Sequence, residues 1–295
     1  MSYLLICIAI GVFSACVQNY YCKNLFQVIS DNMVYQIICY LVALIGTLLI
    51  VKVERPAGFV VFLSVCVGVL ITVECYSLLE AMRCGSMSLT TLFSMAALLI
   101  PAVASPLFFG EEISVFQISG TGLVLLSMFL TLDVPGELRA RKEKKEAGFS
   151  LRWLFFAVTA FFTGGFCAIV EKCLVRSPYA EQSNTYAVMS FGVLILLTAG
   201  ILWFRRQKMG ERVTMKLGPK LLLPLVIIGI GQAGNFILII EALKRLPSSM
   251  VYGINNGARL ILITVLDVLL FRQQLKKIQI AGMAVGAASL VLLCI

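Results

Sequence analysis

Histidine is absent from the 295-residue sequence, and charged residues make up only 13% of it. Without imidazole, the chain lacks the commonest ligand of metal ions and the side chain that most often transfers protons near neutral pH. Soluble proteins carry about 25% charged residues, so the scarcity of charge argues against a water-soluble fold. The ten cysteines lie mostly in apolar segments and without CxxC spacing, which favours small buried side chains over disulfides or zinc ligands. We therefore expect no cofactor and no metal centre.

Apolar residues, by contrast, make up 60% of the chain, compared with about 45–50% in soluble proteins. A membrane-spanning helix needs about 20 predominantly apolar residues. Ten stretches fit, roughly 3–21, 33–51, 58–79, 88–109, 113–132, 151–171, 186–204, 221–243, 248–271 and 278–295. The connectors leave no room for a soluble domain. The composition predicts an all-α integral membrane protein with ten transmembrane helices, multi-pass in the cell (plasma or inner) membrane.

One pattern occurs in both halves of the chain. Glu80–Arg83 reads Glu-Ala-Met-Arg, and Glu241–Lys244 reads Glu-Ala-Leu-Lys. Each tetrapeptide is followed by an apolar run and then by a Gln-Ile-x-Gly tetrapeptide, at Gln117–Gly120 and at Gln279–Gly282. The offsets between the copies are 161 and 162 residues. We interpret this as an internal duplication.

The duplication predicts two five-helix repeats, 1–132 and 151–295, joined by a basic connector loop, 133–150. An odd number of spans per repeat means that the repeats insert with opposite orientation, as in the inverted repeats of secondary transporters. Basic residues favour the cytoplasmic side. One set of loops carries 17 lysines and arginines and the other carries 6. The bias places loops 133–150 and 205–220 in the cytoplasm and predicts Trp153 and Trp203 at the same interface.

The ninth span, 248–271, carries the densest polar content. Its residues Ser248, Tyr252, Asn255, Asn256 and Arg259 follow steps of three or four, so they form one helical stripe. At 1.5 Å per residue, Arg259 lies about 17 Å along the helix from Ser248, near the midplane. A buried arginine costs at least about 2.5–3.5 kcal/mol and needs a partner or water. The first repeat has Ala97 at the matching position.

Three partners for Arg259 are possible. Glu74, in the third span, is the clearest intramembrane carboxylate, and its repeat equivalent is Asn235. Asp267 is eight residues along the same helix, too far for direct contact without bending. A substrate anion is the third. A structural Arg259–Glu74 pair that locks helices together and a substrate-facing role for either residue both remain open.

Other polar positions are weaker candidates. Gln232 and Asn235 lie in the eighth span, where Gly229–Gly234 spells GxGxxG. No strand precedes this motif and no acid lies about 20 residues on, at 249–257, so we interpret it as helix packing or a local loosening of the helix and not as nucleotide binding. Gln18 and Asn19 are candidates from the first span. Gly282–Gly286 spells GxxxG, a packing surface within one chain or between subunits. Three acids at predicted span ends are read as boundary residues: Glu80, Glu171 and Glu241.

At this point the chain resembles the drug/metabolite transporter superfamily, specifically its ten-span EamA-type members, over nearly its whole length. The resemblance is most specific at the repeat ends: the Glu-Ala-Leu/Met turn, then an apolar run into Phe108–Glu112 (Phe-Phe-Gly-Glu-Glu). The second copy departs from it with Arg272-Gln273-Gln274. Members more often place both termini in the cytoplasm, opposite to the charge count. The resemblance implies a small-metabolite carrier, often an exporter.

We therefore expect a transporter that moves a small organic metabolite by alternating access at a central polar site. Arg259 would anchor an anion or pair a charge, and Glu74 would contact a cation, carry a proton or pair with Arg259. The hydrogen-bonding residues would be Gln232, Asn235, Tyr252, Asn255 and Asn256. The alternative is a lipid-linked precursor flippase or an accessory membrane subunit of an envelope pathway. Without histidine or paired acids, an enzyme is not expected. The partners would be solute and membrane lipids, not nucleic acid, for a monomer or homodimer.

Overall fold

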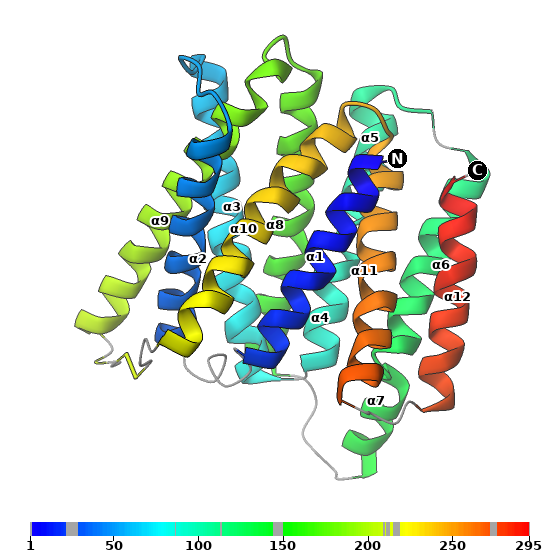
Figure 1. Ribbon diagram of the computed structural model, residues 1–295. Coiled ribbons are helices and arrows are strands. Elements are labelled where there is room, and N and C mark those ends of the chain that lie inside the picture. Colours follow the sequence, from blue (N-terminus) through cyan, green and yellow to red (C-terminus); the bar gives the residue numbers. More distant parts are fainter. Residues whose placement is uncertain are drawn as a thin grey trace. The chain divides into compact units, whose positions relative to one another are not determined.

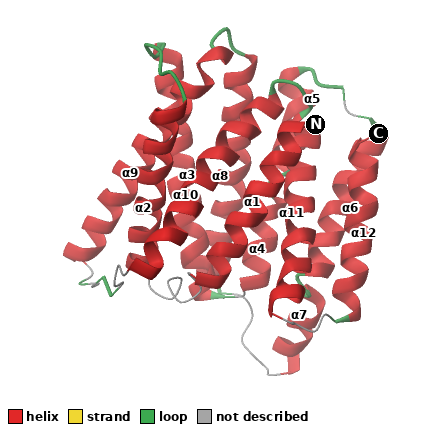
Figure 2. Cartoon of the chain, viewed as in Figure 1, coloured by secondary structure: helices red, strands yellow, loops and turns green. Residues whose placement is uncertain are grey.

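The computed structural model describes residues 2–21, 29–85, 87–112, 114–143, 150–208, 210, 213–214, 219–271 and 276–294. These residues form helices joined by loops, and no strand occurs among them (Figures 1 and 2). Eight helical stretches in the described part are long and apolar enough to cross a membrane. They are α2 (Ile29–Ile50), α3 (Gly58–Cys84), α4 with α5 (Leu89–Phe109), α8 (Leu151–Arg176), α9 (Ser183–Lys208), α10 (Pro219–Leu243), α11 (Ser248–Phe271) and α12 (Lys277–Cys294).

Two further apolar helices have shorter apolar stretches: α1 (Ser2–Tyr21) and α6 (Val115–Thr131). The ten predicted spans therefore correspond to eight membrane-length segments and these two helices. The connector, expected as a loop, is helical over α7 (Val134–Glu143), and a single 3-10 turn, η2 (Ala180–Gln182), precedes α9.

The chain forms two compact units that each combine segments from both halves of the sequence. Unit 1 contains Met1–Thr72 and Val170–Lys244, and unit 2 contains Val73–Ile169 and Arg245–Ile295. The boundaries fall inside α3 and α8, so each of these helices contributes one part to each unit. Each unit therefore draws helices from both predicted repeats.

In unit 2, α6 and α12 pack against each other in antiparallel directions. A methyl group added to Gly120 would lie 2.9 Å from Leu293, and one added to Gly282 would lie 2.6 Å from the backbone N of Thr131. The Ser127 hydroxyl also donates a hydrogen bond to the Gly282 carbonyl (2.7 Å). Small residues permit this approach, so the GxxxG motif makes a contact within the chain.

In unit 1, α2 and α9 are likewise antiparallel neighbours. Just beyond the end of α2, the Glu54 N–H donates to the Thr185 hydroxyl at the start of α9 (3.1 Å). At the other end, Asp31 at the start of α2 accepts a hydrogen bond from the Thr214 N–H, beyond the end of α9 (2.7 Å). The buried core between the two helices contains Tyr40, Ala43, Ala187, Phe191 and Leu194.

The fourth predicted span, 88–109, is not one continuous helix. It divides into α4 (Met87–Ala96) and α5 (Leu99–Phe109), separated by a turn at Ala97 and Leu98. Pro101 explains the break, because its nitrogen carries no hydrogen and cannot bond the Ala97 carbonyl. That carbonyl instead accepts from the Ile100 N–H (3.1 Å). The segment remains one candidate span of membrane length, Leu89–Phe109, with a turn near its middle.

Candidate functional site

The glycine pair of α8 lies against both Glu74 of α3 and the α4–α5 break, all within unit 2. A methyl group added to Gly164 would lie 2.7 Å from Oε1 of Glu74 and 3.3 Å from Cβ of Ala97. One added to the neighbouring Gly165 would lie 2.3 Å from the Ile100 side chain. The absence of side chains on α8 therefore lets the Glu74 carboxylate and the break approach the same helix.

The predicted polar stripe lies on one side of the continuous helix α11, also in unit 2. At about 100° per residue, Tyr252, Asn255 and Arg259 fall within one narrow arc. Gly253 and Gly257 point roughly the opposite way, where they pack against Leu293, and against Leu290 and Val124. Asn255 is 3% exposed and Ser248 is fully buried, whereas Tyr252, Arg259 and, at the edge of the arc, Asn256 are half-buried.

The first and eighth spans contribute a second polar group, in unit 1. The Cys7 thiol of α1 lies 2.7 Å from Oδ1 of Asn235 on α10 and donates a hydrogen bond to it. One turn away, the Ser14 hydroxyl approaches Gly231 so closely that any side chain there would collide with it. Ser14 is 9% exposed, and neither its hydroxyl nor the buried Oε1 of Gln232 has a hydrogen-bond partner among the described residues.

The predicted site residues are thus divided between the two units. Glu74 and the α11 stripe belong to unit 2, whereas Gln232, Asn235 and the half-buried Gln18 belong to unit 1. The Asn19 and Asp267 side chains lie outside the described residues. A pairing between Arg259 and Glu74 stays a hypothesis.

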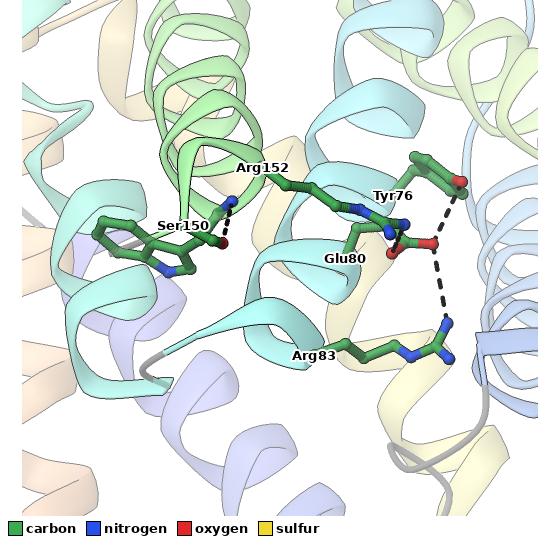
Figure 3. A network of polar contacts seen from close by, with 6 residues as sticks. Tyr76, Glu80, Arg83, Ser150 and Arg152 are labelled. Atoms are coloured by element: carbon green, nitrogen blue, oxygen red, sulfur yellow. Dashed lines mark hydrogen bonds and ion pairs between the residues drawn. The ribbon is translucent and has the colours of Figure 1, made fainter. Parts of the chain in front are cut away.

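The end of α3 carries an ion cluster that sequence reasoning did not anticipate (Figure 3). Glu80, expected as a boundary residue, lies near the end of α3 and is only 3% exposed. Its carboxylate accepts hydrogen bonds from Arg152 (3.2 Å) and from the Tyr76 hydroxyl (3.4 Å), and Arg83 lies 3.8 Å away. A carboxylate buried in this way needs the nearby cations to offset its loss of hydration.

Trp153, beside this cluster, is buried. It is 3% exposed, while Trp203 is 66% exposed. Its backbone N–H bonds the Ser150 hydroxyl that caps α8 (3.0 Å), and its indole N–H donates to the Thr90 hydroxyl (2.9 Å). The indole is therefore covered by α4, and the placement of Trp153 at the membrane interface stays a prediction.

The matching motif in unit 1 forms a similar but smaller cluster. Lys244 lies 2.5 Å from Glu241 and donates to the Ser183 hydroxyl at the start of α9 (3.1 Å). On the neighbouring α8, the buried Lys172 donates to the Leu243 carbonyl at the end of α10 (3.3 Å). Both copies of the Glu-Ala motif therefore join the end of one helix to the start of another, α3 to α8 through Arg152 and α10 to α9 through Ser183.

The Gly-Glu pair that ends the first apolar run also has a structural role. Gly110 ends α5 with a left-handed backbone (φ +63°), a conformation that glycine adopts without strain. The next residue, Glu111, accepts a hydrogen bond from the Ser248 N–H at the start of α11 (3.0 Å). A carboxylate at a helix N-terminus satisfies a backbone donor and stabilises the helix.

Comparisons with known proteins agree with this architecture. The family described as “EamA-like transporter family” matches residues 151–295. A solved structure described only as “Crystal structure of protein” is similar with a TM-score of 0.71 and 15% identity, over 98% of each chain. At that identity the likeness shows a shared fold and nothing of activity. A search of curated proteins gave no match.

Proposed function

The chain belongs to the EamA-like transporter family, part of the drug/metabolite transporter superfamily, and we propose that it is a secondary carrier that exports a small organic metabolite. The family and the apolar helices make it a multi-pass membrane transporter. The class of solute, the direction of transport and the mechanism are the proposal. Family members are transporters and not enzymes, so we propose no catalytic residue.

The observation that carries the proposal is the polar stripe on α11. A chain with so few charges places a half-buried arginine and a buried asparagine on one side of a membrane-length helix. The cost of an arginine at that depth, at least about 2.5–3.5 kcal/mol, has to be offset by an interaction partner. Charged side chains inside membrane spans typically mark the path of a transported solute, and on that ground we assign Arg259 to contact with an anionic group of the solute.

The antiparallel pairs in the two units support the inverted-repeat architecture. The repeat pattern equates α2 with α9 and α6 with α12, and equivalent helices of inverted repeats run in opposite directions. Both pairs do so. We propose ten transmembrane helices in repeats 1–132 and 151–295, joined by 133–150, with alternating access between inward- and outward-open forms. Loops 133–150 and 205–220 are assigned to the cytoplasmic side of the plasma or inner membrane.

Individual roles follow from charge and hydrogen-bonding capacity. Arg259 anchors an anionic group of the solute or balances Glu74, and Glu74 contacts a cationic group. Hydrogen bonds from the α11 stripe orient the solute. Gln232, whose Oε1 has no hydrogen-bond partner among the described residues, is a separate candidate for hydrogen bonding. Asn235 is already bonded to Cys7, which makes it the weakest of the group for direct contact.

The test is a thermal-shift screen of the detergent-purified chain against amino acids, amines, nucleosides and organic acids. A solute that raises the unfolding temperature of the wild type, but not of Arg259→Ala, supports the proposal. The conservative Arg259→Lys keeps the charge and should retain part of the shift. Stabilisation by a phospholipid and by none of the solutes would contradict the proposal and favour the flippase alternative.

A further inference from the structure

The ion cluster at the end of α3 carries more positive than negative charge. It joins the Glu80 carboxylate to two guanidinium groups, those of Arg83 and Arg152 (Figure 3). Nη1 of Arg83 lies 3.8 Å from Oε1 of Glu80, and Nη2 of Arg152 lies 3.2 Å from Oε2. The two guanidinium groups are therefore neighbours, and together they leave one positive charge that this carboxylate does not balance.

The two arginines are exposed although the carboxylate between them is buried. The Arg152 side chain is 67% exposed and that of Arg83 is 49% exposed, whereas that of Glu80 is 4% exposed. A guanidinium group has five N–H donors in a planar fork. Arg152 uses one of them in its hydrogen bond to Glu80, and Arg83 pairs with Glu80 at a distance longer than a hydrogen bond. Donors on the exposed sides of both arginines are therefore able to bind a second anion.

Neighbouring aromatic rings hold this arrangement in place. The guanidinium carbon of Arg152 lies 5.9 Å from the centre of the Phe156 ring, within the range of a cation–π contact. The Phe156 ring in turn packs edge-on against Tyr76 (6.3 Å between centroids), whose hydroxyl donates to Glu80 (3.4 Å). Because a carboxylate and a ring already fix Arg152, binding of an anion costs it little side-chain freedom. The N-terminus of α8, at Leu151, adds a partial positive charge beside it.

An apolar stripe on α8 begins beside the arginine pair. Leu151, Phe155, Phe162 and Phe166 fall within one arc of the helix at about 100° per residue, and they are 47–84% exposed. Arg152 lies at the edge of the same arc. From Leu151 to Phe166 the stripe is roughly 22 Å long, which is longer than one leaflet of the hydrocarbon core, about 15 Å. The positive charge thus stands at the end of a surface along which an acyl chain can lie.

The equivalent motif in unit 1 is built differently. Glu241 pairs with Lys244, one carboxylate with one ammonium group, and the Lys244 side chain is only 20% exposed. The Lys244 ammonium group also donates to the Ser183 hydroxyl (3.1 Å), which lies at the start of α9 where unit 2 has Arg152 at the start of α8. Two exposed guanidinium groups on one carboxylate are therefore a property of the α3–α8 cluster and not of the repeated motif.

We propose that Arg83 and Arg152, held beside each other by Glu80, bind the phosphate group of an anionic phospholipid whose acyl chain lies along the α8 stripe. Arginine matches phosphate because its planar fork donates two parallel hydrogen bonds to the phosphate oxygens. The charge count assigns this end of the helices to the cytoplasmic side, and the cytoplasmic leaflet carries anionic lipids. The site goes beyond the proposed transport function and does not depend on it.

The experiment measures the unfolding temperature of the full-length chain in detergent micelles that contain increasing amounts of phosphatidylglycerol, an anionic lipid. Phosphatidylcholine, which is zwitterionic, and glycerol 1-phosphate, a soluble phosphate ester, are titrated in parallel. Four proteins are compared: wild type, Arg83→Gln, Arg152→Gln and the control Arg206→Gln. Arg206 is exposed at the end of α9 and belongs to the same basic set of loops, so its replacement removes the same charge at a different place.

Phosphatidylglycerol should raise the unfolding temperature of the wild type by a few degrees, and phosphatidylcholine and glycerol 1-phosphate should not. The lipid concentration that gives half of this rise should increase about tenfold in Arg83→Gln and in Arg152→Gln, because each loses a charged donor to the phosphate. In Arg206→Gln it should increase by no more than about twofold, because that residue acts only through long-range charge. No rise with phosphatidylglycerol, or an equal rise with phosphatidylcholine, would overturn the proposal. An equal rise with glycerol 1-phosphate, or an equal weakening in Arg206→Gln, would also overturn it, in favour of a site for free phosphate esters or of general attraction to the basic loops.

Each single variant leaves Glu80 paired with the other arginine, so both proteins are expected to fold, and if one does not, the other decides. Arg152→Lys keeps the charge without the planar fork and should weaken the lipid effect by an intermediate factor. An unchanged half-maximal concentration in Arg152→Lys would contradict recognition through the guanidinium fork.

Arg259→Ala separates this site from a lipid held at the α11 stripe. A site on Arg83 and Arg152 predicts an unchanged lipid response in Arg259→Ala; a lost response would overturn it and support the flippase alternative. Failure to find any transported solute would refute the carrier function and leave the lipid site standing, and solute transport without a response to phosphatidylglycerol would do the reverse.

Discussion

Replacing Gly282 by alanine perturbs the closest helix contact in unit 2. The added methyl group would lie 2.6 Å from both the backbone N and the hydroxyl of Thr131, and 2.9 Å from Cβ of Leu130. A side chain could rotate away, but a backbone nitrogen cannot, so α6 and α12 have to separate. Separation also lengthens the hydrogen bond from Ser127 to the Gly282 carbonyl, now 2.7 Å.

Three contributions set the change in the free energy of unfolding, two that destabilise the protein and one that stabilises it. Overpacking costs about 1–3 kcal/mol, and weakening one buried hydrogen bond adds about 0.5–1.5 kcal/mol. Alanine regains about 1 kcal/mol of helix propensity over glycine. We expect Gly282→Ala to lower the free energy of unfolding by about 1–3 kcal/mol.

Gly122→Ala on α6 is the matched control, because it makes the same chemical change where nothing lies within 4 Å. It should be neutral or stabilise by up to about 1 kcal/mol. Thermal unfolding in detergent, followed by circular dichroism, compares the two, with size-exclusion chromatography to check the oligomeric state. Equal unfolding temperatures would refute the close α6–α12 contact. A changed oligomeric state at unchanged stability would instead indicate a GxxxG contact between subunits.

Three further predictions concern the ends of the helices. Trp153→Phe should lower the free energy of unfolding by about 1 kcal/mol, because it removes the hydrogen bond to Thr90. Thr90→Val removes the same bond and should lower it by a similar amount. A double mutant whose loss of stability equals the sum of the two single losses would contradict the bond. Glu111→Ala should cost about 1 kcal/mol by removing the acceptor at the start of α11, measured by thermal unfolding against Glu111→Gln, which keeps an acceptor. Arg152→Ala should cost no more than about 1 kcal/mol, because its side chain is 67% exposed and solvent screens the ion pair; a larger loss of unfolding temperature would mean that the exposed arginine is more tightly coupled than the geometry indicates.

Helix positions could be predicted from the sequence because the thickness of the bilayer fixes the length of an apolar segment. That rule identifies α2, α3 and α8 to α12 within a few residues. It does not locate the turn at Ala97. Proline can either kink or break a helix, and which of the two occurs depends on the helix that packs against it. Here Gly165 leaves room on α8 for Ile100, so the break is accommodated by packing that hydropathy does not report.

The candidate site was accessible to sequence reasoning only in part. Periodicity alone places Tyr252, Asn255 and Arg259 on one side of α11, because a helix fixes that geometry locally. The contact between Cys7 and Asn235 joins residues 228 positions apart, and no local pattern announces it. For the same reason, the sequence alone does not show that α4 covers the Trp153 ring.

Transport of a stabilising solute into proteoliposomes tests the central claim most directly. The purified chain should move the solute across the membrane, Arg259→Lys should retain part of that rate, and Arg259→Ala should lose most of it while keeping the unfolding temperature and helical content of the wild type. Wild-type transport rates in a folded Arg259→Ala protein would contradict the assignment of the α11 stripe as the solute site.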